Sequence, residues 1–275
     1  MHNAVFAALK DENFDEAERL ILNKSTDLSF GNNCVIRYCS DKGHSNLVKL
    51  LLAQGDRIDP GVNEDYPLAI ACTNGHFDIV EMLLKDKRTN CAKYFGHLLQ
   101  GACMRGHNAV VILLLSRMRA DMCLAGISAM DIETNCYNKA IKLAFMHGYW
   151  STVKIFLDAA ETSTETSTET STEAAFLPEG SIDLNVIMKD AIWVRNVEIV
   201  IMLLCHRNFD HSRSNAIEVA CQSGGIKMVE LFLKDGRIDP SMNRNSAIKH
   251  AIKCGHKEIV MLLCDDARVR DTTLI

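Results

Sequence analysis

Histidine and cysteine are the residues of this chain whose side chains could do chemistry, and both are plentiful. The sequence has ten histidines and eleven cysteines, residue types that supply nucleophiles, general bases and metal ligands. Cys72 and His76 are four residues apart, as are Cys103 and His107, and this spacing brings two side chains together on one face of a helix. The chemistry of such pairs would be thiolate–imidazole catalysis or metal binding.

Most of these side chains have an ordinary place in a repeated pattern instead. Gly-His pairs occur at residues 43–44, 75–76, 106–107 and 255–256, and an apolar run follows each of them. The sequence contains no C-x-x-C pair, nucleophile elbow, phosphate-binding loop or dinucleotide fingerprint. We therefore predict no metal site, no cofactor and no catalytic residue. The alternative is a cysteine-dependent enzyme, which would need one thiol far more reactive than the others.

Composition and charge exclude several other classes. The chain has 275 residues, 48% of them hydrophobic, and a formal charge of −5; without a basic block, neither a nucleic-acid partner nor a membrane surface is expected. The longest apolar run, Ala109 to Leu115, has seven residues, whereas a membrane helix needs about 20. The sequence opens without a basic leader and its cysteines are odd in number, so we expect reduced thiols and a cytoplasmic location.

A common register shows which elements position these residues. When the glycine of each of these four Gly-His pairs is taken as an anchor, apolar residues recur seven and four positions before it and five and eight positions after it. These spacings predict two short helices per repeat. Glycine ends the first helix because it adopts the left-handed conformation at the lowest cost. The anchors that share this pattern are Gly43, Gly75, Gly106, Gly148, Arg195, Gly224 and Gly255.

An atypical repeat precedes the first anchor. Asn13 takes the place of its glycine, because asparagine tolerates the left-handed conformation. The apolar residues that fit its two helices are Val5, Phe6, Leu9, Ala17, Leu20 and Ile21. Its polar surface suits the exposed end of a stack, so we assign residues 3–30 to an N-terminal capping unit. Residues 246–275 are assigned to a C-terminal capping unit and tail, within a single domain over residues 1–275.

Two intervals between anchors are long. From Gly106 to Gly148 the interval is 42 residues, and we place a loop insertion at 124–136. From Gly148 to Arg195 it is 47 residues, within which the letters ETST occur three times. A segment without aromatic or branched aliphatic residues cannot offset its ordering entropy, so residues 161–175 are predicted to be a disordered low-complexity loop. Either a short DNA repeat has expanded there, or the segment is a phosphorylatable acidic loop.

The shared residues A-x-x-x-G-H-x-x-[IV]-V-x-x-L-L, as in residues 71–84 and 251–263, resemble the ankyrin repeat. The resemblance covers roughly residues 3–266 and implies an all-α solenoid of about eight helix-turn-helix units with short projecting turns. The family's T-P-L-H motif is reduced to Pro67-Leu68, and its G-A-D-[IV]-N loop has diverged at 55–60 and 236–240. Such divergent repeats are similar to the expanded ankyrin families of large DNA viruses and unicellular eukaryotes.

The resemblance also implies a function. Ankyrin proteins are non-catalytic modules that bind a protein partner on their concave face, through turn tips and the ends of the first helices, and we expect a monomer. Alternatives are a substrate-recruiting adaptor for ubiquitin ligation and a host-directed effector in the host cytoplasm. The binding positions carried over to this sequence are Asp65, Tyr66, Thr73, Asn74, Met104, Arg105, Met146, His147, Trp193, Gln222, Arg244, Asn245 and Lys253.

Overall fold

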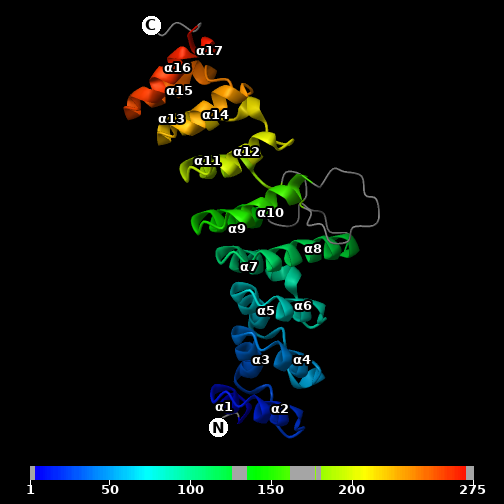
Figure 1. Ribbon diagram of the computed structural model, residues 1–275. Coiled ribbons are helices and arrows are strands. Elements are labelled where there is room, and N and C mark those ends of the chain that lie inside the picture. Colours follow the sequence, from blue (N-terminus) through cyan, green and yellow to red (C-terminus); the bar gives the residue numbers. More distant parts are fainter. Residues whose placement is uncertain (1–3, 126–134, 162–176, 178–180, 271–275) are drawn as a thin grey trace. The chain divides into compact units, whose positions relative to one another are not determined.

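A computed structural model describes residues 4–125, 135–161, 177 and 181–270. Every regular element within these ranges is a helix, and eight successive helix pairs follow the repeat (Figure 1), which confirms the all-α prediction. The first helices of the pairs are α1 (Ala4–Lys10), α3 (Phe30–Lys42), α5 (Val62–Asn74), α7 (Cys91–Met104), α9 (Asn135–Met146), α11 (Leu184–Trp193), α13 (Ala216–Ser223) and α15 (Met242–Cys254). The second helices are α2 (Phe14–Leu22), α4 (Ser45–Leu52), α6 (Phe77–Lys85), α8 (Asn108–Ala125), α10 (Trp150–Glu161), α12 (Val197–Cys205), α14 (Ile226–Asp235) and α16 (Lys257–Asp265), with a short α17 (Ala267–Arg270) after them.

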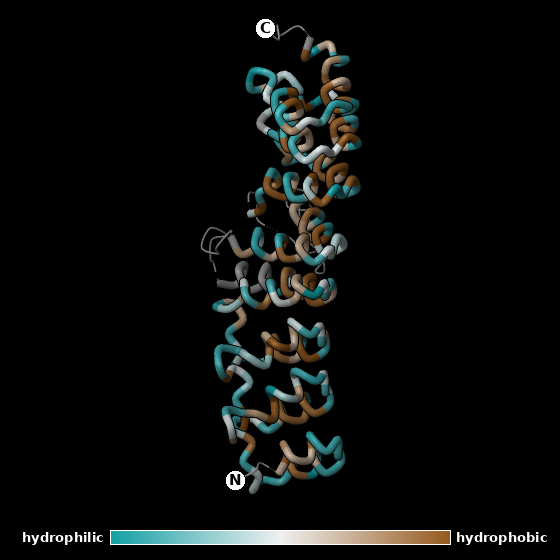
Figure 2. The backbone as a smooth tube through the Cα atoms, turned by 90° about the vertical axis from the view of Figure 1, so that its left-hand side faces the viewer, coloured by the Kyte–Doolittle hydropathy of each residue, from teal (hydrophilic) through white to brown (hydrophobic). Residues whose placement is uncertain are grey.

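The chain, which the sequence analysis treats as a single domain, divides into two compact units. The first consists of residues 1–155 and 165–178, and the second of residues 156–164 and 179–275. In the first compact unit α3, α5, α7 and α9 pack one against the next, and in the second α11, α13 and α15 do the same. Hydrophobic residues are concentrated along the helices and hydrophilic ones in the connecting turns (Figure 2).

The apolar slots predicted from the spacing form the core of each unit. In the third repeat, Leu68, Ala71, Val80 and Leu83 are completely buried. Small alanine at the slot four residues before the anchor lets neighbouring first helices approach closely, and large side chains fill the space between the helices of a pair. Burial of each leucine or valine contributes about 2 kcal/mol, so this periodic core accounts for much of the stability of a repeat.

Two features favour glycine at the end of the first helix, as Gly75 shows. Gly75 has a φ of +77°, and a Cβ atom added there would lie 2.4 Å from Nδ1 of His107 in the next repeat. The ring of His107 is held in this place because its Nε2 donates to the carbonyl of Thr73 at 3.0 Å. His76 lies against Gly43 in the same manner. The repeated histidine is therefore a link between successive repeats, which we call the histidine contact.

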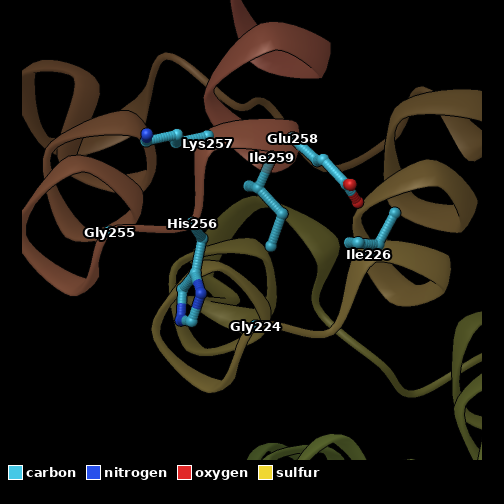
Figure 3. A pocket seen from close by; sticks show the side chains of 7 residues that line it. All are labelled: Gly224, Ile226, Gly255, His256, Lys257, Glu258 and Ile259. Atoms are coloured by element: carbon cyan, nitrogen blue, oxygen red, sulfur yellow. The ribbon is translucent and has the colours of Figure 1, made fainter.

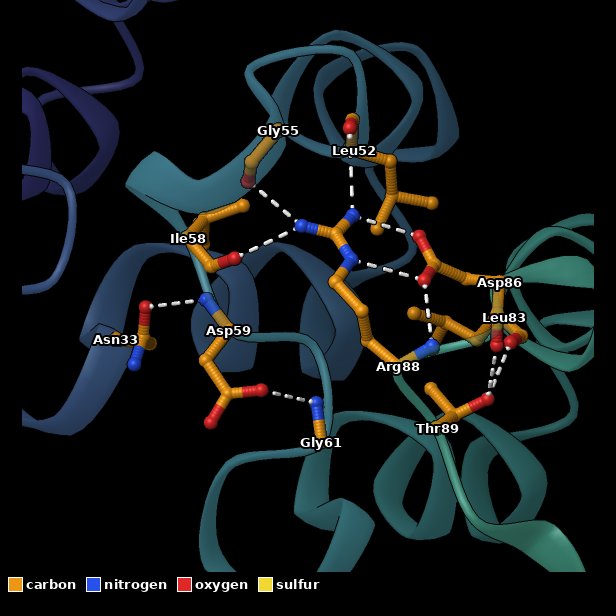
Figure 4. A network of polar contacts seen from close by, with 10 residues as sticks. All are labelled: Asn33, Leu52, Gly55, Ile58, Asp59, Gly61, Leu83, Asp86, Arg88 and Thr89. Atoms are coloured by element: carbon orange, nitrogen blue, oxygen red, sulfur yellow. Dashed lines mark hydrogen bonds and ion pairs between the residues drawn. The ribbon is translucent and has the colours of Figure 1, made fainter.

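An arginine makes a second link between repeats (Figure 4). Arg88 donates to the carbonyls of Gly55 at 2.6 Å, Ile58 at 3.0 Å and Leu52 at 3.4 Å. Asp86 holds the guanidinium group in position, with 2.6 Å between Nη2 and Oδ2. Carbonyls at and beyond the end of a helix lack intrahelical donors, and the arginine supplies them. Arg57 and Arg268 make equivalent bonds to the preceding repeat.

Three first helices begin with an unusual turn. Residues 31–33, 63–65 and 243–245 all have positive φ angles, a conformation that non-glycine residues adopt at some energetic cost. The third residue of each turn is buried: Asn33, Asp65 and Asn245. Oδ1 of Asn33 accepts from the backbone N–H of Asp59 at 2.9 Å, and Oδ2 of Asp65 accepts from that of Asn90 at 3.0 Å. These bonds join the turns at 31–33 and 63–65 to the turn that follows each of them.

The anchor of the first repeat differs from the sequence prediction. The left-handed residue there is Glu12, with a φ of 56°, whereas Asn13 has a φ of −88°. Asn13 is the N-cap of α2, and its side chain accepts from the backbone N–H of Glu16 at 3.2 Å. An asparagine side chain that satisfies a free N–H at a helix start is more useful there than at the left-handed position.

The two predicted insertions lie mostly outside the described residues. The insertion at 124–136 begins within a longer helix, since α8 has 18 residues and α6 has nine, and residues 126–134 are not described. Of the loop predicted at 161–175, only Glu161, the last residue of α10, is described. The capping roles assigned to residues 3–30 and 246–275 stay predictions.

Candidate partner-binding surface

One slot per repeat, two residues before the anchor, is exposed or half-buried beside a buried core. In the first compact unit it holds Thr73 and Met104, both half-buried, and Met146, whose exposed fraction is 71%. The residues that directly precede this slot in the sequence, such as Cys72 and Cys103, are completely buried. The end of each first helix therefore presents one side chain outward from a fixed position.

Hydrogen bonds connect two of the predicted binding residues. Nδ2 of Asn74 donates to the backbone carbonyl and to Oδ1 of Asp41, both at 3.0 Å, and Nη1 of Arg105 donates to Oδ1 of Asn74 at 3.1 Å. These residues come from α3, α5 and the C-cap of α7, so this series of hydrogen bonds extends across three repeats. Asp41 was not among the residues predicted from the sequence, although it occupies the same slot as Thr73.

Tyr66 is the aromatic member of this surface in the first compact unit. Its exposed fraction is 40%, and the Arg37 guanidinium lies 4.8 Å from the centre of its ring. A cation over an aromatic face contributes about 0.5–1 kcal/mol at an exposed site, so this contact favours the observed positions of both side chains. Arg37, which sits one repeat earlier on α3, is another residue that the sequence prediction missed.

In the second compact unit the same slot holds Trp193, Gln222 and Lys253, all exposed. Trp193 ends α11 with an exposed fraction of 56%, and Val186, seven residues earlier, is 41% exposed. That spacing places the two apolar side chains on one face of the helix. His147, at the end of α9 in the first compact unit, is likewise exposed.

The structure assigns two predicted binding residues to the scaffold instead. Asp65 is 2% exposed and Asn245 4% exposed, because the third residue of the left-handed turn points inward. Burial raises the pKa of Asp65, although the bond from the Asn90 N–H opposes that rise. Their neighbours Tyr66 and Arg244 are exposed, so the outward side chains of these turns remain candidates.

A shallow pocket lies between the last two repeats (Figure 3). It has a volume of about 280 Å³ and is lined by Gly224, Ile226 and the five residues from Gly255 to Ile259. Its one imidazole, His256, is 3.3 Å from the Gln222 carbonyl through Nε2, as in the other histidine contacts. Lys257 and Glu258 point in different directions in Figure 3, so no catalytic set converges there.

The buried cysteines are poor nucleophiles. Burial raises the pKa of Cys39 and of Cys221 to about 12, and it raises the pKa of Cys72 and Cys103 as well. Thiols in such surroundings stay protonated and unreactive at neutral pH. Within the described ranges no group of three or more His, Cys, Asp or Glu residues is placed to hold a metal ion.

None of the described helices is both long enough and apolar enough to span a membrane.

A family model described as ankyrin repeats (3 copies) matches residues 4–94 and 187–273, which together make up more than half of the chain. No curated protein sequence matches the chain. The matched ranges include the repeats that carry Tyr66, Asn74, Trp193 and Lys253.

Proposed function

Because the chain belongs to the ankyrin-repeat family, we propose that it is a non-catalytic module that binds a protein partner through the exposed face of its first helices. Ankyrin repeats are general protein–protein interaction modules, and the family is typically non-catalytic. The proposal concerns the ends of the first helices and the outward residues of the turns that precede them. We further propose that the protein is cytoplasmic and monomeric.

One observation carries the proposal. The slot two residues before the anchor is exposed or half-buried, and its residue type changes from repeat to repeat, whereas the buried slots beside it keep the same character. Threonine, methionine, tryptophan, glutamine and lysine all occupy this slot: Thr73, Met104, Met146, Trp193, Gln222 and Lys253. A scaffold that repeats and a surface that does not are what a specific recognition surface requires. Since the scaffold is ordered before binding, little conformational entropy is lost on association.

The test compares two triple variants on a partner isolated by affinity purification and then purified. Tyr66→Ala, Arg105→Ala and Trp193→Ala together remove exposed residues of the types that dominate interfaces, and we expect binding to weaken about 100-fold or more. The control carries Ile112→Ala, Ile201→Ala and Met261→Ala, which remove apolar side chains that are 39%, 44% and 66% exposed on second helices. Unchanged binding by the first variant, or equal losses in both, would overturn the proposal.

A further inference from the structure

The first helices of the first compact unit carry an excess of positive charge. The charged residues of α9 are Lys139 and Lys142, both exposed. Helix α7 has Lys93 as its charged residue and ends at the exposed Arg105, and α3 contributes Arg37. The chain as a whole has a formal charge of −5, so this basic face does not follow from composition.

The carboxylates on these helices are already engaged. Asp41 is paired with Lys42 at 3.2 Å and accepts from Asn74, and Asp65 is buried. Glu64 is exposed at the turn that begins α5, where its charge acts on Lys93. None of them neutralises the cations toward the C-terminal end of α7 and on α9.

The remaining cations lack acidic partners within the part of the chain that the structure describes. Arg105 donates to the neutral side-chain oxygen of Asn74. Arg37 is half-buried and stacks on Tyr66, with its Nε buried, and no described carboxylate pairs with it. Lys139 and Lys142 are exposed. These cations without acidic partners, together with the exposed Tyr66 and Met146, favour a ligand with carboxylates and some apolar side chains.

We propose that the first helices α3 to α9 bind an acidic segment of a protein partner, with carboxylates over Arg37, Arg105, Lys139 and Lys142. This inference rests on the proposed function and adds the chemistry of the partner. Neighbouring helices are about 10 Å apart, so four of them extend over roughly 30 Å. An extended peptide of about nine residues would span that distance.

The probe is a phage-displayed library of random 16-residue peptides selected on the full-length chain, followed by fluorescence anisotropy with the enriched peptides. We expect the enriched peptides to be rich in Asp and Glu. Arg37→Glu, Lys139→Glu and Lys142→Glu together should weaken their binding about tenfold or more, because reversed charges repel the ligand. The control carries Lys24→Glu, Lys49→Glu and Lys87→Glu, which make the same change of net charge at exposed residues outside the first helices, and should bind as the wild type does.

The outcomes separate this inference from the proposed function. Neutral or basic peptides that lose binding in Tyr66→Ala would overturn the acidic ligand and leave the partner surface standing. Acidic peptides that bind the two charge-reversed variants equally well would overturn the site itself. Displacement of the enriched peptide by a single-stranded uridine 20-mer at equal concentration would point to RNA, and would overturn a protein ligand.

Discussion

The histidine contact makes a prediction that isolates one steric interaction. Gly75→Ala places a methyl group in the space of the His107 ring, 2.4 Å from its Nδ1. Gly55→Ala is the matched change in the same compact unit, because Gly55 also has a positive φ, +65°, but a Cβ atom there meets nothing within 4 Å. The two variants share the backbone cost and differ in the clash.

The expected costs follow from these contacts. Alanine in the left-handed conformation costs about 1 kcal/mol relative to glycine, and this is the whole effect expected for Gly55→Ala. In Gly75→Ala the ring must also move, which breaks the bond to the Thr73 carbonyl, about 1 kcal/mol, and disturbs packing by about 1 kcal/mol more. We therefore expect Gly75→Ala to lower the free energy of unfolding by about 3 kcal/mol. Any loss of unfolded-state entropy is common to both variants and cancels.

Urea unfolding followed by tryptophan fluorescence measures this difference. The chain has two tryptophans, with Trp150 in the first compact unit and Trp193 in the second. In a Trp193→Phe background the signal reports on Trp150, whose ring centre is 5.6 Å from that of Phe145. The midpoint and slope then give the stability of the unit that contains Gly75.

A double variant decides whether the clash is the cause. In a His107→Ala background the methyl group meets no ring, so Gly75→Ala should cost about 1 kcal/mol, the backbone term alone. If Gly75→Ala and Gly55→Ala cost the same, or if the cost of Gly75→Ala is unchanged without the ring, the steric explanation of the Gly-His pair is refuted.

Three further predictions concern arginine, histidine and cysteine. Arg88→Ala should lower the free energy of unfolding in urea by about 2 kcal/mol, because it leaves carbonyls of the preceding repeat without their donor. The control Arg237→Ala, which removes an ion pair whose arginine is 48% exposed, should lower it by less than about 1 kcal/mol. Equal losses of stability in the two variants would contradict the linking role of Arg88. Burial lowers the pKa of His107 below its usual 6.5, so the unfolded chain takes up the proton first as the pH falls. The free energy of unfolding should therefore fall as the pH drops through about 6.5. His107→Gln should flatten this pH dependence, and an unchanged slope would contradict the assignment to His107. Cys254, which is exposed, should react with a disulfide reagent far faster than the buried Cys72; the reverse order would contradict the burial of Cys72 and reopen the question of a reactive thiol.

The helices could be predicted because they depend on local spacing. The apolar slots and the left-handed glycines repeat at fixed distances, so an anchor such as Gly75 fixes the bounds of both helices around it. The same reasoning identified Arg195 as a substitute anchor, and its φ of 56° confirms this. At the first repeat the prediction failed by one residue, because Asn13 serves as an N-cap and Glu12 accepts the left-handed position.

The links between repeats could not be predicted in this way. Arg88 and the carbonyl of Ile58 are 30 residues apart, and no local spacing relates the two. The left-handed turns caused the other failure, since helical periodicity does not describe three residues of positive φ. Asp65 and Tyr66 are adjacent in sequence and equally plausible as binding residues, yet one is 2% and the other 40% exposed.

The links have a direction. His76, His107, Arg57, Arg88 and Arg268 each supply the donor, and the acceptor carbonyl always belongs to the repeat made earlier by the ribosome. During synthesis, a newly emerged helix pair thus displays carbonyls whose donors arrive only with the next pair, some 30–36 residues later. Each of these five residues therefore completes the hydrogen bonds of the repeat before its own.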